Sequence, residues 1–145
     1  MLMPDVNILV YAHRREDPSH EFYRAWVERL ANGNEPFALS AIVAFAFMRI
    51  VTHPRFAPVP TPRHQAYAVI DSLATLRHCQ WINPGENHWK LVKEFCDAAS
   101  AQGKLVADAQ HASVALEHGC RWVTRDTDFE AFRSVGLRLE ILQPE

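Results

Sequence analysis

The sequence predicts an α/β fold, a three-layer α/β/α domain around a mainly parallel sheet. Short apolar segments alternate along the chain with longer segments in which apolar residues recur every three or four positions. These are the patterns expected of buried strands and of amphipathic helices. Strands that alternate with helices favour a parallel sheet covered by helices on both faces. The 145 residues fit a single domain, 1–145, that is long enough to bury a core.

The composition excludes several classes of protein. With 48% hydrophobic and 22% charged residues, the chain has the composition of a globular protein and not of a disordered one. Because the formal net charge is −2, nucleic-acid binding would require a local basic patch. Three separated cysteines without a CxxC pair give no disulfide framework or zinc ribbon. The sequence contains no recognisable signal peptide and no apolar run of membrane-spanning length, so we expect a cytoplasmic protein with no membrane partner.

The first half of the chain is expected to begin with a strand at residues 1–4. Asp5 follows directly, either as the N-cap of a short buried helix over residues 6–12 or as a site residue. Three later helices share one start signal, a capping side chain before a proline at the first helical position: Asp17-Pro18, Thr61-Pro62 and Asn83-Pro84. We expect the aromatic residues that follow, such as Trp26 and Trp89, to lie in the core.

The middle of the chain carries an unusually apolar helix. After a short strand at 36–39, Ser40 is the expected cap of a helix over 41–51, which Thr52-His53-Pro54 ends before a proline-rich loop at 56–62. A helix that is apolar nearly all round is either central or covered by a second subunit. Its only charge, Arg49, therefore requires a partner or a ligand.

The last third contains strands at 80–83, 121–124 and 137–142. Before the second of these, a helix with Leu105, Ala109, Ala112 and Leu116 on one face is expected to open on Asp108 and to end at Gly119. A carboxylate in the first turn of a helix is favoured by the helix dipole, so we expect Asp108 to be ionised. The loop beyond the strand carries Asp126 and Asp128.

Three of these acids are candidates for a metal site. Asp5, Asp108 and Asp126 each lie at a strand end or helix start on one expected edge of the sheet, where chemistry collects in open parallel sheets. Carboxylates brought together repel one another unless a cation lies between them, and hard oxygen ligands select Mg²⁺ or Mn²⁺. Such an ion activates water against a phosphodiester. The alternative is three unrelated helix caps and loop acids.

Four segments carry a family resemblance: DVNILVYA, RIVTHPRF, LVADAQHASVALEHG and WVTRDTDF. In this order and spacing they resemble PIN-domain ribonucleases, specifically the VapC-type toxins of toxin–antitoxin pairs, over essentially the whole chain. The resemblance implies a PIN-like fold in which Asp5, Asp108 and Asp126 bind the metal. It implies that Asn7 orients the first acid and that Thr124 supports the site. Asp128 is then a further acid of the site, or only a cap for residues 129–132.

The chain departs from the family pattern in its central helix. Typical members carry a glutamate three residues before the position of Arg49, where this chain has Ala46. This puts a second metal ion in doubt, and we expect one Mg²⁺ on three aspartates. It also leaves open a catalytically silent PIN-like protein that binds RNA or a protein partner. A receiver-like signalling domain fits less well, because residues 121–129 contain no lysine.

The resemblance implies an endoribonuclease toxin that cleaves structured RNA, tRNA or rRNA, and leaves a 3′-hydroxyl. It further implies a cognate VapB-like antitoxin and a toxin homodimer, and residues 41–51 and 56–62 are the candidate contacts. Basic residues near the expected edge are candidates for phosphate binding, although solvated surface charge is the simpler interpretation of any one of them. The set is Arg14, Arg15, Arg49, Arg55, Lys104 and Arg125, of which Arg14, Arg49 and Arg125 are the main RNA-binding candidates.

Overall fold

The computed structural model describes all 145 residues and contains one five-stranded sheet in which every strand pair is parallel. The strands are β1 (Leu2–Pro4), β2 (Phe37–Ser40), β3 (Cys79–Ile82), β4 (Arg121–Thr124) and β5 (Arg138–Ile141), in the order β3-β2-β1-β4-β5. Each lies within one residue of its expected position, except that the first and last are shorter. The predicted parallel sheet is confirmed.

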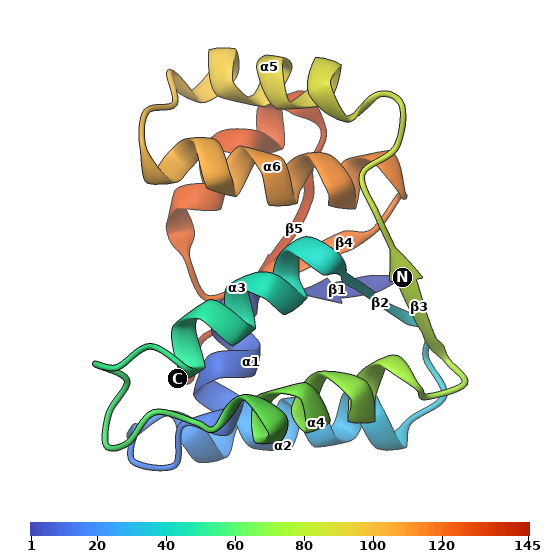
Figure 1. Ribbon diagram of the computed structural model, residues 1–145. Coiled ribbons are helices and arrows are strands. Elements are labelled where there is room, and N and C mark those ends of the chain that lie inside the picture. Colours follow the sequence, from blue (N-terminus) through green and yellow to red (C-terminus); the bar gives the residue numbers. More distant parts are fainter.

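Helices cover both faces of this sheet (Figure 1). One side carries α1 (Val6–His13), α2 (His20–Asn32), α3 (Ala41–Val51) and α4 (Arg63–Ala74). The other side carries α5 (His88–Ala99), α6 (Lys104–Glu117) and the 3-10 helix η1 (Thr127–Val135). The three-layer α/β/α architecture is therefore confirmed. None of these helices has the length and apolar character needed to cross a membrane.

The strand order places a topological switch point at β1. This strand pairs with β2 on one side and with β4 on the other, so the carboxyl ends of β1 and β4 lie next to each other. Pro4 is in register with Val123, and the Asp5 backbone N–H donates to the Val123 carbonyl at 2.7 Å. Parallel sheets bind ligands in the crevice outside such a reversal of strand order. The fold thus brings Asp5 to the end of β4 although 118 residues separate Asp5 from Val123.

The core fixes these strands between the helix layers. Met3, Phe37 and Trp122 from adjacent strands are fully buried, as are Phe47 of α3 and Phe132 of η1. Burying one large apolar side chain contributes about 1.5–3 kcal/mol. The residues that flank the strand ends are therefore held in place by packing on both sides of the sheet.

The three proline-based helix starts are wrong in detail. The helices α2, α4 and α5 begin at His20, Arg63 and His88, one to four residues beyond the prolines. The expected caps bind elsewhere: Asp17 Oδ1 accepts from the Ser19 N–H at 2.8 Å, and the buried Thr61 hydroxyl bonds to His13 Nε2 at 2.8 Å. Asp17 and Thr61 are thus used in a turn and in a tertiary contact, so neither side chain caps the helix that follows.

The expectation that Trp89 lies in the core is also wrong. Its side chain is 69% exposed, while Val92 and Phe95 of the same helix are buried. Trp89 lines a hollow of about 520 Å³ between the first turns of α5 and α6. The helical period places Trp89 near the buried face of α5, but α6 does not cover its side chain at the start of the helix. Trp26, by contrast, is partly buried against the core, as expected.

Candidate metal centre

Asp5 acts as a helix cap and as a site residue at the same time. It follows β1 directly, and its Oδ1 accepts from the Val6 N–H at 2.6 Å, which caps α1. Its other carboxylate oxygen accepts from the Thr124 hydroxyl at 2.6 Å. Only 4% of Asp5 is exposed. The two interpretations of this residue are therefore compatible, because each uses a different oxygen.

The Thr124 hydroxyl connects the parts of the site. While donating to Asp5, its Oγ1 accepts from Asn7 Nδ2 at 3.1 Å and from the Asp126 N–H at 3.0 Å. A hydroxyl has one donor and two acceptor positions, and all three are used here. Asn7 therefore contacts Asp5 only indirectly, because both residues hydrogen-bond to the Thr124 hydroxyl. The side-chain Oδ1 of Asn7 also accepts from the Arg125 backbone N–H at 3.4 Å.

Asp108 lies deeper in its helix than the sequence pattern indicates. Because α6 begins at Lys104, Asp108 is the fifth helical residue, and the prediction that it lies in the first turn is wrong. The shift of its pKa is also opposite in direction to the one expected from the helix dipole. Burial raises the pKa of Asp108, although a hydrogen bond from Lys104 opposes this shift. For this carboxyl group, burial outweighs the hydrogen bond and the positive charge of Lys104.

Asp126 and Asp128 complete an acidic cluster. Carboxylate oxygens of Asp108, Asp126 and Asp128 lie within 4.8 Å of one another. Asp5 lies outside this tight set and connects to it through Thr124. Asp126 Oδ1 accepts from the Asp128 N–H at 2.9 Å, so Asp126 and not Asp128 caps η1.

Lys104 is the cation of this cluster. Its Nζ lies 2.9 Å from Asp108 Oδ2, 2.8 Å from Asp126 Oδ2 and 4.0 Å from Asp128 Oδ2. Burial alone would lower the pKa of Lys104, but its bonds to Asp126 and Asp108 raise it. The pKa of Asp126 is lowered because hydrogen bonds from Lys104 and the Asp128 N–H outweigh burial. Lys104 was expected only among the phosphate-binding candidates; its i,i+4 spacing from Asp108 was the available signal for this ion pair.

The electrostatics of the site suit a divalent cation. Burial raises the pKa of Asp5 to about 7, and the nearby Asp108 and Asp126 add to this effect, while hydrogen bonds from Thr124 and Val6 oppose it. A buried carboxyl group next to other carboxylates is costly to ionise without a compensating charge. Hard oxygen donors of this kind fit Mg²⁺ or Mn²⁺.

The basic candidates divide into two groups. Arg14, Arg49 and Arg55 line a hollow of about 260 Å³ together with His53 and other residues, and none of the three arginines forms an ion pair. Arg125 stacks closely on Tyr11, with its guanidinium carbon 3.9 Å from the ring centroid, whereas Arg14 lies 5.6 Å from the centroid of Phe56. The Nη1 of Arg125 is buried without a hydrogen-bond partner. Arg49 and Arg55 are exposed and Arg14 is partly exposed, whereas Arg125 precedes Asp126 in the chain and packs on Tyr11. Arg15 is exposed and lines a neighbouring hollow.

His111 packs inside the fold, away from any catalytic contact. Its ring stacks on Trp122 at 5.3 Å, and burial followed by the charge of Lys104 lowers its pKa to about 4. The ring is therefore neutral at physiological pH.

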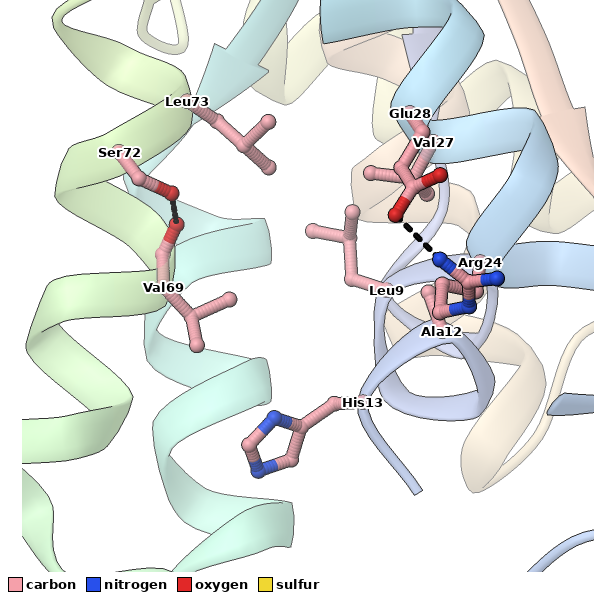
Figure 2. Close-up of a pocket in the computed structure, with 9 residues that line it drawn as sticks. All are labelled: Leu9, Ala12, His13, Arg24, Val27, Glu28, Val69, Ser72 and Leu73. Carbon is pink, nitrogen blue, oxygen red and sulfur yellow. Dashed lines mark hydrogen bonds and ion pairs between the residues drawn. The ribbon is translucent and has the colours of Figure 1, made fainter. Parts of the chain in front are cut away.

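A separate cavity lies between α4 and the pair α1 and α2, as Figure 2 shows. It has a volume of about 180 Å³, and apolar residues such as Leu9, Val27 and Leu73 make up much of its lining. His13 points into the gap, whereas Arg24 and Glu28 form an ion pair at its side. No acid of the candidate metal centre lines this cavity.

Comparison with known proteins identifies the family of the chain. The PIN domain family model matches residues 2–135. Ribonuclease VapC31 from Mycobacterium tuberculosis is 37% identical over 135 residues, which cover 93% of this chain and 95% of the relative. Ribonuclease VapC43 from the same organism is 38% identical over 138 residues, which cover 95% and 94%.

Solved structures share the fold. VapBC2 from Rickettsia felis, bound to a DNA fragment from its promoter, aligns with a TM-score of 0.67 at 23% identity over 96% of each chain. The sarcin-ricin loop cleaving toxin VapC20 from Mycobacterium tuberculosis aligns with a TM-score of 0.68 at 12% identity over 99% of this chain and 100% of that one. Together with the family match and the VapC relatives, these observations show that the chain belongs to the PIN-domain family, among the VapC ribonucleases.

Proposed function

We propose that this chain is a metal-dependent endoribonuclease toxin of the VapBC type, with Mg²⁺ or Mn²⁺ bound by Asp5, Asp108 and Asp126. The observation that carries the proposal is the tight cluster of Asp108, Asp126 and Asp128, to which Asp5 connects through Thr124 at the switch point of the sheet. Asp128 adds a carboxylate oxygen to the same cluster. Ala46 is the one departure, since α3 supplies no carboxylate at that position.

The bound ion would activate water and neutralise charge on a phosphodiester. Residues of this chain hold the carboxylates in position for the ion. Thr124 holds Asp5 and the Asp126 backbone in a fixed relation, and Asn7 fixes the Thr124 hydroxyl. Because the pKa of Asp5 is about 7, part of the protein carries this proton at neutral pH, and cation binding would release it.

RNA is the proposed substrate, and structured RNA such as tRNA or rRNA is the proposed target. The relatives are named ribonucleases, and one protein of the same fold is a sarcin-ricin loop cleaving toxin. The unpaired Arg14, Arg49 and Arg55 offer guanidinium groups to backbone phosphates in a protein whose net charge is −2. Arg125, stacked on Tyr11 beside the acids, is a further RNA-binding candidate.

A VapB-like antitoxin and a second copy of the toxin are the proposed partners. Structures of similar fold include VapBC complexes. On this chain, Phe45 of α3 is 73% exposed and Val59 of the following loop is 66% exposed. Exposed large apolar residues on these two segments support the expectation that they form partner contacts.

The decisive experiment is cleavage of total RNA by the purified protein with and without Mg²⁺ or Mn²⁺. We expect cleavage that EDTA stops and that Asp108→Asn abolishes, while Asp71→Asn, which changes an exposed acid of α4, leaves it unchanged. Divalent-ion binding by the wild-type protein without RNA turnover would instead support the catalytically silent alternative that Ala46 leaves open.

A further inference from the structure

We propose that Lys104 supplies the second positive charge of this active site, in place of a second metal ion, and remains on the carboxylates when one divalent ion is bound. The inference rests on the proposed function, because it concerns the charge balance of the same site. It explains how a PIN-domain chain that lacks the glutamate of the central helix still neutralises its acids.

The contacts of Lys104 carry the proposal. Its ammonium bonds to Asp108 at 2.9 Å and to Asp126 at 2.8 Å, and it approaches Asp128 to 4.0 Å. These are the acids that form the tight cluster. No other basic side chain forms an ion pair with these acids. Arg125, the nearest arginine in sequence, lies over the Tyr11 ring instead.

The charge balance favours a retained lysine. Four carboxyl groups meet at the site, from Asp5, Asp108, Asp126 and Asp128. A single divalent ion would leave two formal negative charges if all four were ionised, and the ammonium reduces this excess to one. Ala46 provides no oxygen for a second ion from α3, so the tethered ammonium is the remaining source of positive charge within the site.

The position of Lys104 in the fold keeps the ammonium in the site. Lys104 begins α6 and lies one helical turn before Asp108, so its tether to the carboxylates is short. Its side chain is also 66% exposed. The ammonium is therefore accessible to the phosphate of a bound RNA, where fixed positive charge stabilises a phosphodiester in its transition state.

Titration with Mn²⁺ tests the charge role without using activity. Lys104→Met, Lys104→Arg and the wild type are compared by calorimetry, with Lys90→Met as a control because Lys90 is an exposed lysine of α5 that forms no ion pair. We expect one Mn²⁺ in the wild type, at least tenfold tighter binding in Lys104→Met, and near wild-type affinity in Lys104→Arg and Lys90→Met. Removing a lysine that only organises the carboxylates would weaken binding, and unchanged or weaker binding would overturn the proposal.

A second measurement distinguishes a retained cation from one that simply leaves when metal binds. Single-turnover RNA cleavage is measured at saturating Mn²⁺ for the same variants, after circular dichroism has shown that they are folded. We expect Lys104→Met to be at least tenfold slower than wild type, and Lys104→Arg to retain more of the rate. Equal or faster cleavage by Lys104→Met would refute the retained charge. A wild-type protein that neither binds Mn²⁺ nor cleaves RNA would refute the proposed function itself.

Discussion

A single hydroxyl group determines the geometry of the candidate centre. Thr124 lies at the end of β4, buried beneath Asp5, Asn7 and the Asp126 backbone, and it uses all of its hydrogen-bonding positions on them. Residues that orient metal ligands typically contribute about 10–100-fold to metal affinity or activity.

Thr124→Val keeps the size of the side chain and removes the hydroxyl. We expect it to lower Mn²⁺ affinity and RNA cleavage by about 10–100-fold, because Asp5 loses its donor and Asn7 and Asp126 lose their acceptor. Calorimetric titration and initial cleavage rates measure both effects. Thr124→Ser retains the hydroxyl and should remain close to wild type. Equal losses in the two variants would show that the methyl group and not the hydroxyl matters.

Asp5 gives the metal-free protein a pH-dependent stability. Its pKa is about 7 in the fold against 3.8 in the unfolded chain, so the folded state holds the extra proton between these values. The stabilisation by this proton is complete below pH 4 and is lost as the pH rises through 7, at a total cost on the order of 4 kcal/mol.

Urea denaturation in EDTA at pH 5 and pH 8 measures this loss, and Asp5→Asn is the matching neutral variant. We expect the wild type to lose more stability than Asp5→Asn between the two pH values. Comparing the two proteins removes the contribution of His111, whose lowered pKa has the opposite effect on the pH dependence of stability. Identical pH dependence in both proteins would contradict a buried, neutral Asp5.

At the scale of elements, the connection from α6 to β4 joins Asp108 to Asp126. Gly119 lies in this connection with a φ of +67°, and the chain enters β4 two residues later. The left-handed conformation costs an L-residue with a side chain about 1–2 kcal/mol. The sequence expectation that Gly119 ends this helix is confirmed. The helix runs to Glu117, His118 is its capping residue, and Gly119 follows in the left-handed conformation.

Gly119→Ala should lower the free energy of unfolding by about 1 kcal/mol through backbone strain alone. A Cβ at this position meets no atom within 4 Å, so no steric clash contributes. The midpoint of urea denaturation measures the effect, and cleavage at a temperature where the protein is folded should be unchanged. Gly119→Asn should cost less, because asparagine adopts the left-handed conformation more readily. A neutral Gly119→Ala variant would contradict this account of the turn.

At the scale of the whole molecule, charge is segregated despite a net value of only −2. The acids lie at the carboxyl ends of β1 and β4. The helices α1 and α3 begin at the same edge of the sheet and lead away from it. Arg14 caps the far end of α1, and Arg49 lies in the last turn of α3. If the proposed function holds, these two arginines bind phosphate away from the acids, so we expect their removal to weaken RNA binding without affecting metal binding.

The double variant Arg14→Gln/Arg49→Gln should bind RNA more weakly, with no change in Mn²⁺ affinity. In the Asp108→Asn background, which prevents cleavage, the slope of log affinity against log salt should become shallower by about 0.7 for each phosphate of single-stranded RNA that the variant no longer neutralises. Filter binding across a salt series measures it. Arg138→Gln is the control, because this exposed residue begins β5 at the opposite edge of the sheet. Equal slopes in the double variant and the control would exclude these arginines from RNA binding.

The sequence by itself determined the strands, the parallel α/β class and the main acids. These features depend on local periodicity, on the apolar segments and on motif spacing, which are encoded over short stretches. Ser40 is an example: it caps α3 as expected, with its hydroxyl 3.2 Å from the Val43 nitrogen. Such a signal is readable because the donor and acceptor are only three residues apart.

Only the tertiary structure decided how these acids behave. The helix-start rule placed Asp108 in a first turn, but burial against the sheet raised its pKa and α6 began at Lys104. Likewise, the role of Thr124 depends on bonds to residues more than 100 positions away. Burial and long-range hydrogen bonds depend on which elements the fold brings together, and local sequence pattern carries no direct measure of either.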